Sequence, residues 1–274
     1  MNMELGFFWL AVVFYGLSAF SYIFGLISRK EKLFSAGMIL GFIGLAGNIM
    51  AVALRWIKGG ILPFIDISES ITSSVLVAMV IFLIVQVSAK RIRAIGVLVM
   101  PVAFILLGWA GTLMKEISGQ LPASLQSYWL WVHIVGASIG FGSVLVAAGA
   151  GLLYLLKEKC QSGFYDKLPE LPDLDNLAYR FVTGGFIMLG LMLISGAFWS
   201  NQVHGKFWNW DPVEVWSLIC WLVYGIYLHL RRSFGWRDRK LAWYTLLALV
   251  VIIVSYWGIP FISENFHTGF RIEH

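Results

Sequence analysis

The sequence predicts an all-α integral membrane protein, a polytopic bundle of about eight transmembrane helices. Apolar residues make up 59% of the 274 residues and charged residues only 13%, whereas about a quarter of a typical soluble domain is charged. Apolar runs of about 18 residues or more recur along the chain, and each can cross a hydrocarbon core about 30 Å thick as a helix. Barrel strands instead alternate over about ten residues. Composition therefore excludes a water-soluble fold, and run length favours helices over a barrel.

The apolar runs define the predicted elements in chain order. The predicted spans are residues 5–27, 34–56, 70–88, 94–115, 129–156, 180–200, 214–232 and 240–262. The first run has no basic region before it and no small-residue cleavage site after it, so we expect a permanent helix rather than a removed signal. The 157–180 connection holds two prolines and mixed charge, which predicts a solvated loop with a short surface helix. We expect one transmembrane domain over 1–274.

The distribution of basic residues predicts the orientation of these spans. Fifteen of the 20 Lys and Arg residues lie in alternate connections, namely 28–33, 89–93, 157–180 and 231–240. The positive-inside rule places these connections in the cytoplasm and both termini on the extracytoplasmic side. We therefore attribute the net charge of +5 to membrane orientation. The expected partner is the lipid bilayer, and no nucleic acid is expected.

A tryptophan-rich segment on the predicted extracytoplasmic side is the first candidate functional site. Residues 199–216 read W-S-N-Q-V-H-G-K-F-W-N-W-D-P-V-E-V-W, with indoles at Trp199, Trp208, Trp210 and Trp216. Tryptophan is common in the headgroup zone, and for Trp199 and Trp216 alone that explanation suffices. The W-N-W-D-P-V-E unit instead offers a flat apolar surface for a large aromatic ligand. Its acids, Asp211 and Glu214, are expected to cap the following helix and complement its dipole.

Histidines on the same side could supply metal ligands. Four of the five histidines lie there: His133, His204, His267 and His274. Neutral imidazole is a common axial ligand of haem iron, and His133 and His267 could provide it from two parts of the chain. Gly136 and Gly140 follow His133 on the next turns and would admit either another helix or a flat ligand. His267 taken alone could equally be a solvated tail residue.

His229 differs because it lies inside a predicted span, where an ionisable residue is a functional candidate by default. It ends a single helical stripe that begins about 22 Å away at Glu214. The members of the stripe are Glu214, Leu218, Trp221, Gly225 and His229. A histidine hydrogen-bonded to a neighbouring helix, or one near Arg231 at the inner interface, is the alternative.

These residues resemble a known family. H-G-K-F-W-N-W-D-P-V-E-V-W-S-L-I-C-W-L-V-Y-G-I-Y-L-H resembles the W-G-x-x-W-x-W-D-P-x-E-x-W block of the CcsA/ResC-type subunit of the System II cytochrome c synthase, within the WWD haem-handling group. G-G-I-L-P-F-I-D-I-S-E-S, L-Q-S-Y-W-L-W-V-H and L-D-N-L-A-Y-R support the resemblance, which covers nearly the whole chain. It implies a multi-pass protein of the bacterial cytoplasmic (inner) membrane, with 199–216 as an extracytoplasmic haem-binding loop.

The resemblance also implies a site and a function. Haem b would be held by His133 and His267 as axial ligands beside Trp208, Trp210 and Asp211, and His229 would serve where haem enters. Further cofactor-binding candidates are Trp199, Trp216, Trp221 and His204. His204 stands where the family usually has tryptophan, so it could be an extra ligand, a proton donor to a propionate or a tolerated polar residue. We expect no catalytic acid or base, and binding should be non-covalent because the chain has no C-x-x-C-H.

The implied function is haem handling for the maturation of c-type cytochromes. The chain would be a subunit of holocytochrome c synthase, a haem lyase, that acts with a CcsB/ResB-type membrane subunit. It would present haem for thioether attachment to the C-x-x-C-H segment of apocytochrome c. Two alternatives stay open: a CcmC-like module that exports or presents haem without ligation, and a HemX-like regulatory membrane protein of haem synthesis.

Overall fold

The computed structural model describes residues 3–60, 62–64, 66–115, 127–160, 165 and 168–262. Within them every regular element is helical, and eight helices are long and apolar enough to cross a membrane. The helices are α1 (Met3–Ser28), α2 (Glu31–Gly59), α3 (Ile67–Ser88), η1 (Lys90–Ile95), α4 (Gly96–Thr112), α5 (Tyr128–Lys159), α6 (Leu171–His204), α7 (Pro212–Ser233), α8 (Asp238–Ile253), η4 (Val254–Gly258) and α9 (Ile259–Ile262). The predicted fold class is confirmed.

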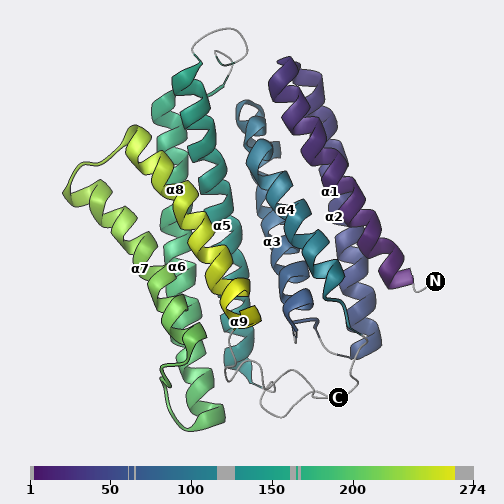
Figure 1. Ribbon diagram of the computed structural model, residues 1–274, viewed down its shortest axis with the longest axis vertical. Helices are drawn as coiled ribbons and strands as arrows, with labels where there is room; N and C mark the ends of the chain where they lie inside the picture. The colour runs from purple at the N-terminus through teal and green to yellow at the C-terminus, as the bar shows by residue number, and fades with distance from the viewer. Residues whose placement is uncertain are drawn as a thin grey trace.

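Successive long helices run in opposite directions and form two groups, α1–α4 and α5–α8, with α5 packed against α3 and α4 (Figure 1). We call the side drawn at the bottom of Figure 1, where α1, α3, α5 and α7 begin, the lower side, and the opposite one the upper side. The turns at 28–33, 89–93 and 231–240 all lie on the upper side. Alternate basic connections thus share one side, and their cytoplasmic location stays a prediction.

Glycines allow the closest helix contacts, as Gly136 and Gly140 in α5 illustrate. A Cβ on Gly136 would lie 3.0 Å from the Met188 carbonyl oxygen and 3.1 Å from the Met192 nitrogen of α6, and one on Gly140 would lie 2.9 Å from Leu189. Their neighbour is therefore another helix, not a ligand. This packing brings the backbones of α5 and α6 together beside His133.

Two segments expected to be loops are partly helical. α6 begins at Leu171, so the predicted loop over 157–180 is wrong for 171–179. Pro172 suits a first helical turn, and the buried Asp175 pairs with Arg231 of α7 at 2.7 Å, a contact between residues far apart in sequence. The 199–216 segment is likewise helical up to His204 and again from Pro212, so only 205–211 connects the two helices.

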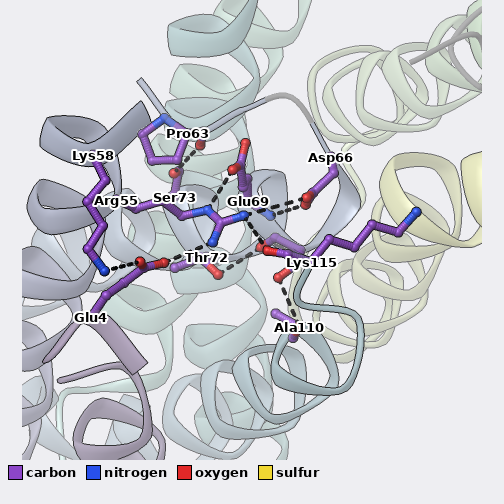
Figure 2. Close-up of polar contacts among 11 residues, drawn as sticks. Glu4, Arg55, Lys58, Pro63, Asp66, Glu69, Thr72, Ser73, Ala110 and Lys115 are labelled. Carbon is purple, nitrogen blue, oxygen red and sulfur yellow. Dashed lines mark hydrogen bonds and ion pairs between the residues drawn. The ribbon is translucent and has the colours of Figure 1, made fainter. Parts of the chain in front are cut away.

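A buried ion cluster fastens the lower side of the α1–α4 group (Figure 2). Arg55 of α2 donates from Nη1 to Glu4 of α1 at 2.8 Å and from Nε to Glu69 of α3 at 2.6 Å. Its Nη2 donates to the carbonyl oxygen of Lys115, beyond α4, at 3.1 Å. The Arg55, Glu4 and Glu69 side chains are each only 9% exposed. One guanidinium therefore ties four segments together.

Candidate functional site

A pocket opens on the lower side of the α5–α8 group, between the start of α5, the end of α6, the 205–211 connection and the start of α7. Its empty volume, counted together with the open solvent at its mouth, is about 670 Å³. The predicted site residues that line it are His133, Trp199, His204, Trp208 and Asp211. The other lining residues are Leu193, Gly196, Ala197, Ser200, Val203, Phe207, Asn209, Val213, Glu214 and Ser217.

Hydrogen bonds to both flanking helices hold the 205–211 connection. α6 ends at Gly205, whose φ of 71° is left-handed, a conformation that favours glycine. Asp211 caps α7 by accepting from the Val213 N–H at 2.7 Å, as predicted. Glu214 accepts from the Asn209 N–H at 2.7 Å, and the Asn209 side chain donates to Ser200 of α6 at 2.8 Å. The predicted cap is confirmed for Asp211, whereas Glu214 holds the connection instead of capping α7.

The tryptophans of the segment divide between the inside and the outside of the pocket. Trp199 and Trp208 line it, whereas Trp210 and Trp216 do not. The Trp210 ring meets the Trp208 ring edge-on, with centroids 6.0 Å apart, and is 76% exposed. Trp210 also has a φ of 59°, a left-handed conformation that costs a non-glycine residue about 1–3 kcal/mol. Trp199 and Trp208 are therefore the indoles of the pocket wall, and Trp210 lies outside it against Trp208.

His133 combines a pocket position with a defined tautomer. Its Nδ1 lies 2.9 Å from the Met192 carbonyl oxygen of α6, and because a carbonyl can only accept, Nδ1 must carry the proton. Nε2 is then the nitrogen with the lone pair, which is the form that binds a metal ion. The Trp199 ring lies 6.2 Å from the His133 ring. In its neutral form this imidazole, at the wall of an aromatic pocket, has the chemistry of an iron ligand.

Several predicted residues lie away from this pocket. His229 is exposed near the upper end of α7, where its Nδ1 lies 3.2 Å from the Ser233 hydroxyl and its ring meets Phe234 edge-on. Trp221 stacks on Phe186 of α6 at 4.8 Å and donates to the Phe186 carbonyl oxygen. The middle of the stripe from Glu214 to His229 is thus packed against α6. His267 and His274 fall outside the described residues.

Sequence reasoning missed several parts of the site. The Met192 carbonyl oxygen leaves no trace in the sequence because every residue has a carbonyl. Gly196 could have been noticed in the sequence, because it is a small residue three positions before Trp199. Only the structure shows that it faces His133. Val203 and Phe207 were also missed, although they lie within the tryptophan-rich segment that drew attention.

Fold and site together define a class: a multi-pass helical membrane protein with an aromatic pocket and a metal-competent histidine at one end of the bundle. Residues 64–267, which include the pocket, match the family described as Cytochrome C assembly protein. The chain is 31% identical over 249 residues to the cytochrome c biogenesis protein CcsA of Prochlorococcus marinus (strain NATL1A), covering 78% of each. It is 28% identical over 273 residues to CcsA of Trieres chinensis, covering 87% of each.

The chain therefore belongs to the cytochrome c assembly protein family. The predicted family and the predicted general function, haem handling in the maturation of c-type cytochromes, are confirmed at this level. Among solved structures, the fold is similar to that of the cytochrome c heme lyase CcmF, with a TM-score of 0.73 and 16% identity. The match covers 93% of this chain and 46% of that one, so the likeness concerns the fold alone.

Proposed function

We propose that the pocket between α5, α6 and α7 holds haem b non-covalently and presents it for thioether attachment to apocytochrome c. The observation that carries this proposal is the His133 hydrogen bond to Met192, which puts the lone pair of the neutral ring on Nε2, the nitrogen that would coordinate iron. His267 is proposed as the second axial ligand. An incoming C-x-x-C-H histidine would replace one of these two ligands.

The chain's own residues bind and orient the substrates rather than supply reactive groups. Trp199 and Trp208 would contact the macrocycle face, since indoles offer large apolar surfaces for stacking. Asp211 and Glu214 hold the connection that carries Trp208 in place. Each cysteine thiol would add across a haem vinyl group, forming one C–S and one C–H bond as S–H and the C=C π bond break. No oxidant is consumed, so positioning is the main contribution of the protein.

Residues outside the pocket have separate proposed roles. The exposed position of His229 on α7 makes it accessible to haem that enters from the membrane on the upper side. Trp210, exposed outside the pocket, would contact the arriving apocytochrome, and His204 would face the haem edge from the pocket wall. We assign Trp216 and Trp221 to helix packing near the site. A CcsB/ResB-type subunit, the bacterial inner membrane and an extracytoplasmic lower side complete the proposal.

The ligand proposal is tested on the purified protein by visible spectroscopy. His133→Ala and His267→Ala are each expected to lower haem content and shift the Soret band, because each removes an axial donor. Trp208→Ala should lower haem content as well, whereas Trp216→Ala, which lies outside the pocket, is the matched control. An unchanged Soret band and haem content in both histidine variants would refute the site.

The attachment step separates the proposed function from its alternatives. Co-expression with a CcsB/ResB-type subunit and an apocytochrome reporter should yield covalently bound haem that survives acid extraction. A chain that loads haem but yields no thioether product acts as a CcmC-like presentation module. A chain that purifies without haem and changes early haem synthesis acts as a HemX-like regulator.

A further inference from the structure

We infer that Gly196 and the Met192 carbonyl of α6 position His133, so that a glycine in a transmembrane helix determines how the iron ligand is held. The inference rests on the proposed function, because it concerns the ligand of the same pocket. It assigns a positioning role to two residues that the tryptophan-rich motif does not include.

The hydrogen bond between His133 and Met192 crosses two helices at their backbones. In an α-helix the carbonyl of residue 192 already accepts from the N–H of residue 196. A carbonyl oxygen has two lone pairs. The Met192 oxygen lies 2.9 Å from His133 Nδ1 and 3.1 Å from the Ser195 hydroxyl, whose closer acceptor is the Leu191 carbonyl oxygen at 2.6 Å. Gly136, one turn after His133, brings α5 close enough for the contact between His133 and Met192, since its missing Cβ would lie 3.0 Å from the Met188 carbonyl oxygen.

Gly196 provides the space into which the imidazole fits. A Cβ at this position would lie 2.8 Å from His133 Nδ1 and 3.1 Å from Cε1. Gly196 does not have a positive φ, so its backbone conformation does not require glycine. Glycine inside a helix costs about 0.5–1 kcal/mol relative to alanine. The close approach of the His133 ring is therefore the reason for a glycine here.

A second contact to the Met192 turn of α6 comes from the π-helix that follows α8. The π-helix η4 (Val254–Gly258) carries Tyr256, whose hydroxyl lies 3.1 Å from Met192 Sδ and 3.4 Å from the Ala137 carbonyl oxygen. Met192 accepts the hydrogen bond from His133, and Ala137 lies one turn after His133 on α5. π-Helical turns occur frequently at functional sites, and this one places the Tyr256 hydroxyl against the two helices that hold His133.

The hydrogen bond has chemical consequences for the ligand. A ring N–H held by a carbonyl fixes the tautomer and raises the basicity of the other nitrogen. A more basic axial nitrogen stabilises ferric relative to ferrous iron. Loss of such outer contacts typically lowers metal affinity about 10–100-fold. Displacing the His133 ring should therefore weaken haem binding and raise the haem midpoint potential.

The first test compares two glycines of the same helix in the full-length chain. Gly196→Ala is expected to lower haem affinity about 10–100-fold and to raise the midpoint potential. Gly184→Ala is the matched control, because a Cβ there would meet nothing within 4 Å, and it should bind haem as the parent does. Parental affinity and potential in Gly196→Ala would overturn the inference.

The second test keeps Gly196 and so does not depend on the folding of its variant. His133→Gly should lose the Soret band of the parent, and added imidazole should restore it by occupying the vacated position. 1-Methylimidazole has similar basicity but no N–H to donate to Met192, so it should restore the band only at a higher concentration. Equal rescue by both ligands would overturn the inference while leaving His133 as a ligand. An unchanged Soret band in His133→Gly would instead overturn the proposed function.

Discussion

Two connections on the lower side, between α2 and α3 and between α6 and α7, share a sequence pattern and serve different purposes. G-I-L-P-F-I-D-I-S-E at 60–69 and G-K-F-W-N-W-D-P-V-E at 205–214 have glycine, aspartate and glutamate at the same spacing. Gly60 and Gly205 both have left-handed φ, and Asp66 and Asp211 both cap the next helix.

The two glutamates show the difference. Glu69 pairs with the buried Arg55, whereas Glu214 accepts from the backbone N–H of Asn209. The first connection is thereby fastened to α1 and α2 by charge, as Figure 2 shows. The hydrogen bonds described for the second connection run to its own flanking helices, and a pocket lies beside it. Buried charge closes the lower end of the α1–α4 group, while indoles, an imidazole and local hydrogen bonds surround an open pocket at the lower end of the α5–α8 group.

The largest expected effect comes from removing the central charge of the closed end. Arg55→Met leaves Glu4 and Glu69 buried without their main partner, which should cost about 3–5 kcal/mol of stability. Thermal unfolding in detergent measures this loss. The matched control is Lys58→Met. Lys58 is 40% exposed and contacts a single oxygen of Glu4, at 3.2 Å. Such a surface pair contributes about 0–1 kcal/mol. Equal losses of stability in the two variants would show that the burial of Arg55 does not make its ion pairs more important for stability than the exposed pair of Lys58.

Truncating each of the two glutamates in turn should separate an effect on stability from an effect on haem binding. Glu214→Ala leaves the Asn209 N–H without its acceptor, which costs about 1–3 kcal/mol, and frees the connection that carries Trp208. Haem titration should therefore show weaker binding. Glu69→Ala should lower the melting temperature at least as much, with haem affinity per folded molecule unchanged. If Glu69→Ala also weakened haem binding, the two ends would not be independent.

The two capping aspartates allow a closer comparison. Asp66→Ala and Asp211→Ala should each cost about 0.5–2 kcal/mol, the usual effect of a lost N-cap. Only Asp211→Ala is expected to reduce the Soret absorbance, because Asp211 lines the pocket. Asp→Asn at either position retains an acceptor and serves as the control, with unfolding and haem content close to those of the parent.

The smallest effect concerns the strained backbone of the open end. Trp210→Gly and Trp210→Ala both remove the indole, and they differ only in the Cβ at a φ of 59°. The glycine variant should be more stable by about 1 kcal/mol, because glycine adopts this conformation without steric cost. Equal melting temperatures would mean that the backbone relaxes out of the left-handed region in the alanine variant. Neither change should alter the haem spectrum, since Trp210 does not line the pocket.

Local patterns were predictable and contacts between distant residues were not. The spans, the capping by Asp211 and the packing glycines follow from hydropathy and spacing. The early start of α6 was missed because Asp175 is stabilised by Arg231, 56 residues further along. Arg55 looked like an ordinary charge at a helix end, and only the convergence of Glu4 and Glu69 from other helices shows that it is buried.

The amino-acid sequence by itself determined that the chain is a membrane-spanning helical bundle whose aromatic segment lies on the side opposite its basic connections. Both follow from the cost of exposing polar groups to lipid, which depends on composition and order along the chain. Tertiary structure alone decided which tryptophans line the pocket, which nitrogen of His133 carries its proton and why residue 196 has no side chain. Those properties depend on distances between helices, and the distances are set by how close their backbones can pack.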